Sequence, residues 1–390
     1  VRAGWGQVGN ENVAPYITFP SVFANSQFAF DGATLSPGSS PNSFGNPSLT
    51  WETTTTTNLG LDFGFFNGRA SLTLEAFQKN TTDLLLDVPI PDTNGGGFVT
   101  RNVGEVENRG IDVNLSGTLI NTDSFDWNST LTYSYTENEV VDLGGVDEIQ
   151  GNFGSIDGQS RQWNRIQVGR PIGQLYGSTF LGTWKSTDDI PLNQAGNPIA
   201  EPGDARYLRD GDGERVIRAI GNGTPRIFWG WNNTLNYKNW DLNLFVQGVH
   251  GFRVLNAVQG IIVGNTGNQR SFLAADQVNQ WTPSNETDIP AGGINDAGST
   301  RYVENGGFIR LSNLALGYTF RDIGGSGTTA KLYVSGQNLF LITDYTGYDP
   351  EHTSLPANAD NETNVDQAAG INAGSYPNPR TLSIGIKVGF

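Results

Sequence analysis

Hydrophobic and polar residues alternate along the regular stretches of this chain. In residues 381–390 (TLSIGIKVGF), apolar side chains occupy every second position from Leu382 to Phe390. Successive side chains of a β-strand point to opposite faces, so the pattern predicts a strand with one apolar and one polar face. A soluble edge strand this apolar would invite aggregation, whereas a membrane barrel turns its apolar face to lipid and its polar face to the lumen.

The same alternation recurs in pairs of stretches joined by short turns. Residues 53–65 and 69–79 flank Asn67-Gly68, a dipeptide that favours tight hairpins. Further pairs are residues 111–119 with 125–137, 229–237 with 240–246, and 308–320 with 329–341. The sequence therefore predicts an all-β, antiparallel transmembrane β-barrel wall of about ten strands, most of them roughly 9 to 14 residues long.

Long segments rich in Gly, Asn, Asp and Pro separate these hairpins. They are residues 10–50, 80–104, 139–225, 252–300 and 342–378. Outer-membrane barrels have long extracellular loops and short periplasmic turns, and long loops usually carry function. We therefore expect residues 1–390 to belong to one barrel domain whose function resides in extracellular loops.

Aromatic residues are predicted at the membrane interface, where amphipathic rings are most stable. They are Trp229, Trp231, Tyr237, Trp240 and Phe390. The first four surround the short turn at residues 238–239. The core of a soluble β-sandwich would also alternate, but the long strands and the one-sided long loops favour the membrane barrel.

Composition agrees with a barrel and excludes other classes. Only 36% of the 390 residues are hydrophobic, and no run approaches the roughly 18 apolar residues that a membrane helix needs. The net charge of −16 disfavours nucleic acid as a partner, because that partner requires a basic surface. Cys is absent, which excludes disulfides and thiolate metal sites. Met is absent even at position 1, so we expect a piece of a longer protein.

Several motifs, in order along the whole chain, resemble the SusC/RagA family of TonB-dependent outer-membrane transporters. They are residues 2–10 (RAGWGQVGN), 46–54 (NPSLTWETT), 102–110 (NVGEVENRG), 306–318 (GGFIRLSNLALGY), 337–340 (QNLF), 345–351 (YTGYDPE) and 378–390. The resemblance implies that this chain is the C-terminal part of a barrel of about 22 strands. It also implies an N-terminal plug domain, which is absent from this chain.

The resemblance further implies a function and partners. These are import of an oligosaccharide or peptide across the bacterial outer membrane, a SusD-like surface lipoprotein as a lid, and TonB acting through the plug. Outer-membrane lipids surround such a barrel, and transporter–lid pairs can associate as dimers. Two alternatives stay open: a non-transporting outer-membrane barrel that serves as an adhesin or assembly partner, and a soluble β-rich protein that binds or cleaves glycans.

Aromatic residues in the long segments are the candidates for contact with a ligand or lid. They are Trp163, Trp184, Trp281, Tyr345 and Tyr348. Flat rings offer a platform for sugar faces or peptide side chains and lose little rotamer entropy on binding. The alternative is that each ring packs the loops against one another or against a lid protein.

Other candidate chemistry is weak. Asp210, Asp212 and Glu214 alternate as calcium ligands do, but the twelfth position counted from Asp210 is Gly221, where an EF-hand loop needs Glu. A turn stabilised by local hydrogen bonds is the favoured interpretation. We therefore expect no cofactor, with calcium as the alternative. No nucleophile motif accompanies His250 or His352, so the sequence does not predict an enzyme.

Overall fold

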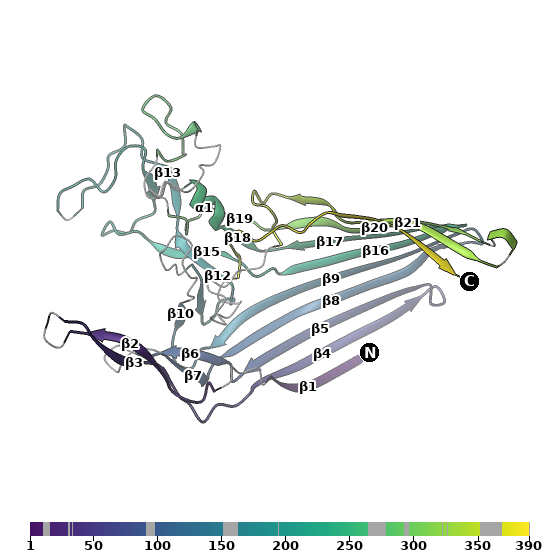
Figure 1. Ribbon diagram of the computed structural model, residues 1–390, viewed down its shortest axis with the longest axis horizontal. Coiled ribbons are helices and arrows are strands. Elements are labelled where there is room, and N and C mark those ends of the chain that lie inside the picture. The colour runs from purple at the N-terminus through teal and green to yellow at the C-terminus, as the bar shows by residue number, and fades with distance from the viewer. Residues whose placement is uncertain are drawn as a thin grey trace.

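The computed structural model describes residues 1–10, 16–29, 32, 34–90, 98–150, 163–193, 195–263, 278–291, 296–321, 323–325, 327–351 and 369–389. Ten long strands lie side by side in one antiparallel sheet (Figure 1). In spatial order they are β1 (Arg2–Asn10), β4 (Glu52–Phe65), β5 (Ala70–Thr82), β8 (Glu105–Asn121), β9 (Phe125–Asp142), β16 (Ile227–Tyr237), β17 (Trp240–His250), β20 (Phe308–Phe320), β21 (Thr329–Thr343) and β23 (Thr381–Gly389). Each long strand pairs with the next one along the chain, which confirms the predicted antiparallel wall.

Strand register separates an apolar face from a polar one. On one face, Leu61, Leu74 and Val113 lie opposite one another on the neighbouring strands β4, β5 and β8. On the other face, Asp62, Thr73 and Asn114 lie opposite one another on the same strands. The apolar side chains are exposed along the last strand, where Ile384 is 77% exposed. Such a continuous exposed apolar face fits contact with lipid, so we call the polar side the lumenal face.

Short turns close one end of the sheet, which we call the turn end. Asn67 and Lys238 both have φ of 54° there, the left-handed conformation that two-residue hairpins require. The Gly-rich connection between β20 and β21 contains the 3-10 helix η3 (Ile323–Gly325). These turns lie where the sequence predicted them.

Three strands exceed the length of roughly 9 to 14 residues that the sequence predicts for most strands. β8 has 17 residues, β9 has 18 and β21 has 15. Near the other end of the sheet, β8 and β9 continue beyond the apolar band with polar pairs, such as Arg109 with Glu137 at 3.3 Å. Cross-strand polar pairs stabilise a ladder as apolar pairs do. Hydrophobic alternation therefore underestimates the length of these strands.

The long segments gather at that other end, which we call the loop end (Figure 1). They contain further short strands instead of forming only irregular loops. These are β2 (Ser21–Phe28), β3 (Ser36–Phe44), β6 (Leu85–Pro89), β7 (Phe98–Asn102), β10 (Glu148–Gln150), β11 (Arg165–Gln167), β12 (Gln174–Ser178), β13 (Phe180–Thr183), β14 (Ala205–Tyr207), β15 (Ile217–Asn222), β18 (Arg253–Asn256), β19 (Val303–Asn305) and β22 (Ile371–Asn372). The helix α1 spans Ala257–Val263, and no helix in the described part of the chain has the length and apolar character to cross a membrane.

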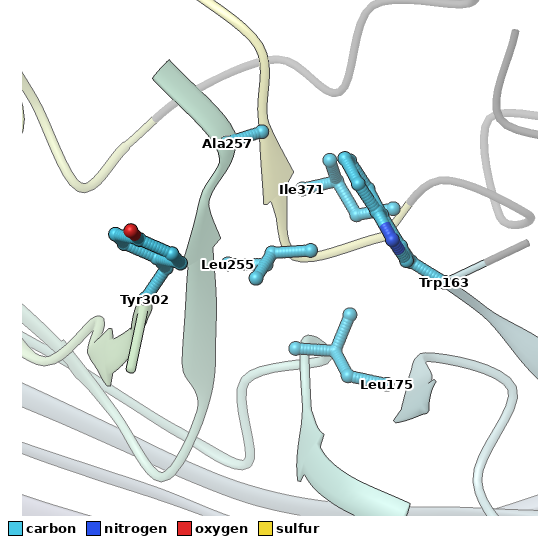
Figure 2. Packing of buried hydrophobic residues seen from close by; sticks show 6 residues of the cluster. All are labelled: Trp163, Leu175, Leu255, Ala257, Tyr302 and Ile371. Carbon is cyan, nitrogen blue, oxygen red and sulfur yellow. The ribbon is translucent and has the colours of Figure 1, made fainter. Parts of the chain in front are cut away.

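A shared hydrophobic core, which we call the loop core, joins the segments at the loop end. Its buried members are Trp163, Leu175, Leu255, Ala257, Tyr302 and Ile371. Figure 2 shows these six side chains converging from separate stretches of backbone. The loop core therefore connects three segments that the sequence separates by long strands. It makes the loop end a packed structure.

Candidate functional site

Burial divides the five loop aromatics into two groups. Trp163, Trp184 and Trp281 are each 7% exposed, and Tyr345 is 5% exposed. Tyr348 is 72% exposed. A ring must be accessible to serve as a platform for a ligand. Four of the predicted contact residues therefore pack the loops in this structure, and Tyr348 alone of the five presents its ring to solvent.

Trp281 joins two loop segments, and Trp184 packs within one of them. The guanidinium carbon of Arg206 lies 4.6 Å from the centre of the Trp184 ring, a cation–π contact. Gly203, with φ of 95°, lies against Trp281, and a Cβ atom there would approach the indole to 2.5 Å. Backbone bonds join the same segments, since the Ala291 N–H donates to the Gly203 carbonyl at 2.9 Å. The segment around Trp184 and Gly203 and the segment around Trp281 and Ala291 thus pack into one unit.

Lys185 adds an electrostatic link to that unit. Its ammonium donates to the Thr183 hydroxyl at 2.9 Å, the Asp288 carboxylate at 2.9 Å, and the carbonyls of Glu286 at 3.0 Å and Thr287 at 3.1 Å. The hydrogen bond from Lys185 lowers the pKa of the Asp288 carboxyl. These contacts fix the two segments in one relative position.

Tyr345 anchors the segment that follows β21. Its buried hydroxyl accepts a hydrogen bond from the Asn372 side chain at 2.8 Å. One residue later, the Thr346 N–H donates to the Glu304 carboxylate at 2.6 Å, and that carboxylate also accepts from Asn256 at 2.9 Å. The segment is therefore attached to the sheet formed by β18, β19 and β22.

A buried ion pair attaches the same segment to the wall. The Arg310 guanidinium of β20 lies 2.5 Å from the Asp349 carboxylate, and both side chains are nearly inaccessible. The other Asp349 oxygen accepts the Asn378 N–H at 3.1 Å, and the Glu351 carboxylate lies 3.4 Å from Arg310. We call Arg310, Asp349, Glu351 and Asn378 the arginine clamp. It holds Tyr348, which immediately precedes Asp349, at the loop end.

Sequence reasoning did not predict the arginine clamp. Its residues occur within three of the family-like motifs, at residues 306–318, 345–351 and 378–390. The sequence does contain one indication of it, because Arg310 lies within an apolar stretch and a buried charge requires a partner of opposite charge. No local pattern singles out Asp349 as that partner among the 39 acidic residues of the chain.

The acidic alternation at residues 210–214 forms a turn. One oxygen of the Asp210 carboxylate accepts the backbone N–H of Asp212 at 3.0 Å and that of Glu214 at 2.9 Å. The Asp210 N–H donates back to the Glu214 carbonyl at 2.9 Å. Within the described ranges, no group of three or more His, Asp or Glu residues is placed to hold a metal ion. The local hydrogen bonds account for this motif.

The sequence pattern places four predicted interface aromatics around one short turn, but the structure places only some of them there. Tyr237 packs edge-to-face on Phe125 at 6.3 Å, and Trp240 packs on Tyr318 at 4.8 Å, both at the turn end. Trp229 stacks on His250 at 6.5 Å at the opposite end of β16. Trp229 and Tyr237 are eight positions apart along an extended strand, or about 26 Å, so they lie near opposite sides of the apolar band.

Two further residues complete the comparison with the predicted interface. Trp231 lies between Trp229 and Tyr237 along β16, and its indole N–H donates to the Ser129 hydroxyl at 3.0 Å. Phe390 lies outside the residues that the structure describes, as does His352. The interface role of these aromatics therefore stays a prediction.

Known proteins resemble this chain in sequence and in fold. Residues 1–339 match the family described as TonB dependent receptor-like, beta-barrel. The chain belongs to this family. TonB-dependent receptor P26 of Formosa agariphila is 36% identical over 100% of this chain, and TonB-dependent receptor SusC of Bacteroides thetaiotaomicron is 27% identical over the same share. Both names are those of receptors and not of enzymes.

Solved structures agree with this placement at the level of fold. The structure of the RagAB peptide transporter matches 99% of this chain with a TM-score of 0.75 and 24% sequence identity. The chain spans about 40% of the length of that protein and of TonB-dependent receptor P26. It is therefore one portion of the TonB-dependent receptor barrel that those longer proteins contain.

Alkaline pH is expected to loosen the loop end of this chain before its wall. Burial raises the pKa of the Tyr207 and Tyr345 hydroxyls above their ordinary value of 10.0. The raised pKa values mean that the two neutral hydroxyls make their full contribution to the free energy of unfolding below pH 10. This contribution is lost as pH rises through the folded-state pKa. Near-ultraviolet circular dichroism should change above pH 10, while the strand signal in the far ultraviolet persists.

Phenylalanine variants provide the control for this alkaline transition. Tyr207→Phe and Tyr345→Phe remove the ionising hydroxyls, so the double variant should undergo the transition at higher pH than the unmodified receptor. If the double variant and the unmodified receptor change at the same pH, these tyrosines do not control the transition.

Proposed function

We propose that this chain forms part of the wall and of the extracellular mouth of a TonB-dependent nutrient importer in the bacterial outer membrane. The two-faced sheet is the observation that carries the proposal. Its exposed apolar face suits lipid, and its opposite face offers polar side chains to a passing solute. In this orientation the packed loop end faces the exterior and the short turns face the periplasm.

The proposed importer acts with partners outside this chain. A SusD-like surface lipoprotein closes the mouth as a lid, and TonB acts through a plug portion of the longer protein. The rigid loop end supports this proposal, because the loop core and the arginine clamp give a docking protein a fixed surface. Association of two transporter–lid pairs into a dimer is part of the same proposal.

The proposed cargo is an oligosaccharide or a peptide. The RagAB relative is named a peptide transporter, which supports the peptide. Tyr348, exposed and held beside the arginine clamp, is the ring that we propose contacts cargo or lid. The family membership favours an importer over an adhesin or assembly partner, and the exposed apolar face disfavours a soluble glycan-binding protein.

Uptake by cells tests this function. Bacteria that carry the full-length gene should accumulate a labelled oligosaccharide or peptide that a deletion strain does not, and a protonophore should abolish the uptake. Tyr348→Ala should lower uptake at limiting cargo concentration, whereas Tyr376→Ala, which alters another exposed loop tyrosine, should not. A surface lipoprotein should co-purify with the receptor. Equal uptake by both strains from broad oligosaccharide and peptide mixtures would reject import.

A further inference from the structure

A pocket of about 630 Å³ opens on the lumenal face of the wall. Polar-face side chains of β5, β8, β9, β16 and β17 line it, and Glu351 of the arginine clamp borders it from the segment after β21. The pocket is separate from the loop core and from Tyr348. Its volume falls in the range of sites that bind small molecules or single side chains.

Two carboxylates lie side by side in the lining of this pocket. Cross-strand register places Glu75 of β5 directly opposite Asp112 of β8. Like charges in directly opposed positions destabilise a sheet. Arg2 offsets the charge of Glu75, since its guanidinium lies 3.4 Å from that carboxylate.

Asp112 has no such compensation. Its carboxylate accepts the Ser134 hydroxyl at 2.5 Å, and no described Lys or Arg forms an ion pair with it. A neutral hydroxyl leaves the negative charge in place. Glu351 brings a further carboxylate to the rim, but that carboxylate lies 3.4 Å from Arg310 of the arginine clamp, and the lining residues themselves include no Lys or Arg. Asp112 thus gives the pocket a negative charge that no described Lys or Arg pairs with.

Apolar surface forms another part of the lining. Phe228 of β16 and Phe245 of β17 contribute aromatic rings. Gly230 of β16 lets the Phe245 ring and the Thr132 side chain lie close to the strand backbone, because a Cβ atom there would come within 3.1 Å of both. Rings next to carboxylates suit a ligand with an apolar stem and a positive head.

We propose that this pocket binds a cationic group on an aliphatic stem, an alkylguanidinium or alkylammonium. The charged head pairs with Asp112, with Glu75 nearby, and the stem lies along Phe228 and Phe245. Charge-assisted hydrogen bonds and contact with the rings stabilise this arrangement. Such a group can come from cargo in the lumen or from a Lys or Arg side chain elsewhere in the longer protein.

Binding of butylguanidinium to the full-length receptor in detergent tests this proposal. The uncharged analogue butylurea has the same stem and nearly the same shape. Isothermal titration should detect butylguanidinium binding that weakens as salt is added, with butylurea binding at least about tenfold more weakly. Asp112→Asn keeps an oxygen for Ser134, removes the charge and should weaken butylguanidinium binding by about the same factor.

Asp126→Asn is the matched control. Asp126 has the same charge on the same face, accepts the side-chain amides of Asn128 and Asn236, and does not line the pocket. This variant should bind butylguanidinium as the unmodified receptor does. Equal affinity for butylguanidinium and butylurea, or equal effects of the two substitutions on that affinity, would overturn the proposal.

Two outcomes support the proposal, and they differ in whether the cation comes from cargo or from the protein itself. Measurable butylguanidinium binding means that the pocket is free for cargo. Absence of binding, together with a lower unfolding temperature for Asp112→Asn than for Asp126→Asn, means that the protein's own side chain occupies it. Absence of binding with equal unfolding temperatures rejects the site. Because no transport is measured, each of these results leaves the import proposal to its own test.

Discussion

Replacing Arg310 with Ala is expected to lower the free energy of unfolding by about 3–5 kcal/mol. Arg310 is buried, and its removal leaves the equally buried Asp349 carboxylate without its cation. An isolated buried charge is strongly unfavourable because it has lost its solvation and gained no partner. The substitution should also release the segment that carries Tyr348 from the wall.

Denaturant unfolding of the full-length receptor in detergent or lipid measures this effect. Arg109→Ala is the matched control, because Arg109 pairs with Glu137 at 3.3 Å but its side chain is 56% exposed. Exposed ion pairs contribute no more than about 1 kcal/mol. Proteases should cut within residues 343–351 faster in Arg310→Ala than in Arg109→Ala. Equal destabilisation by the two substitutions would show that the arginine clamp adds no more stability than a surface pair.

Trp163→Ala is expected to destabilise the loop end by about 3–5 kcal/mol. The indole is 7% exposed and packs in the loop core with Leu175, Leu255 and Ile371. Gly298 lies so close to it that a Cβ atom there would overlap the ring. Truncation leaves a cavity that these neighbours, held on separate strands, cannot fill without moving the backbone.

Protease resistance and near-ultraviolet circular dichroism of the loop end measure the loss. Tyr348→Ala is the control, since Tyr348 is 72% exposed and its removal should change stability by no more than about 0.5 kcal/mol. The far-ultraviolet strand signal should be retained in Trp163→Ala, because the ten-stranded sheet does not include the loop core. Equal protease resistance of the two variants would contradict this assignment.

The alternation of apolar and polar residues was sufficient to predict the wall because the long strands have one apolar face and one polar face. Residues 53–65 and 69–79 pair around the predicted Asn67-Gly68 turn, with Leu61 opposite Leu74 in the structure. Periodicity of two is a local property of strands, so it requires no knowledge of distant residues. The polar extensions of β8 and β9 were missed because apolar alternation stops where the sheet leaves the apolar band.

The loop end could not be predicted in the same way. All five residues of β12, Gln174 to Ser178, are buried, so the strand has no exposed face to reveal a period. Burial of Trp163 depends on Leu255 and Ile371, which lie far along the chain. The Arg310–Asp349 pair likewise joins residues that no local pattern connects. Tyr348 was among five similar aromatics, and only packing distinguishes it from the four buried ones.

The loop core has a consequence for the order of folding. Four pairings in the wall join strands across short turns, whereas β9 and β16 pair across a long segment, with Tyr135 opposite Ile227. The loop core needs Trp163, Leu255 and Ile371 together, and these residues lie in three segments whose ends come together only when the wall strands pair. It should therefore form after the wall. A nascent barrel would first be an open cylinder of strands whose entrance acquires its shape last.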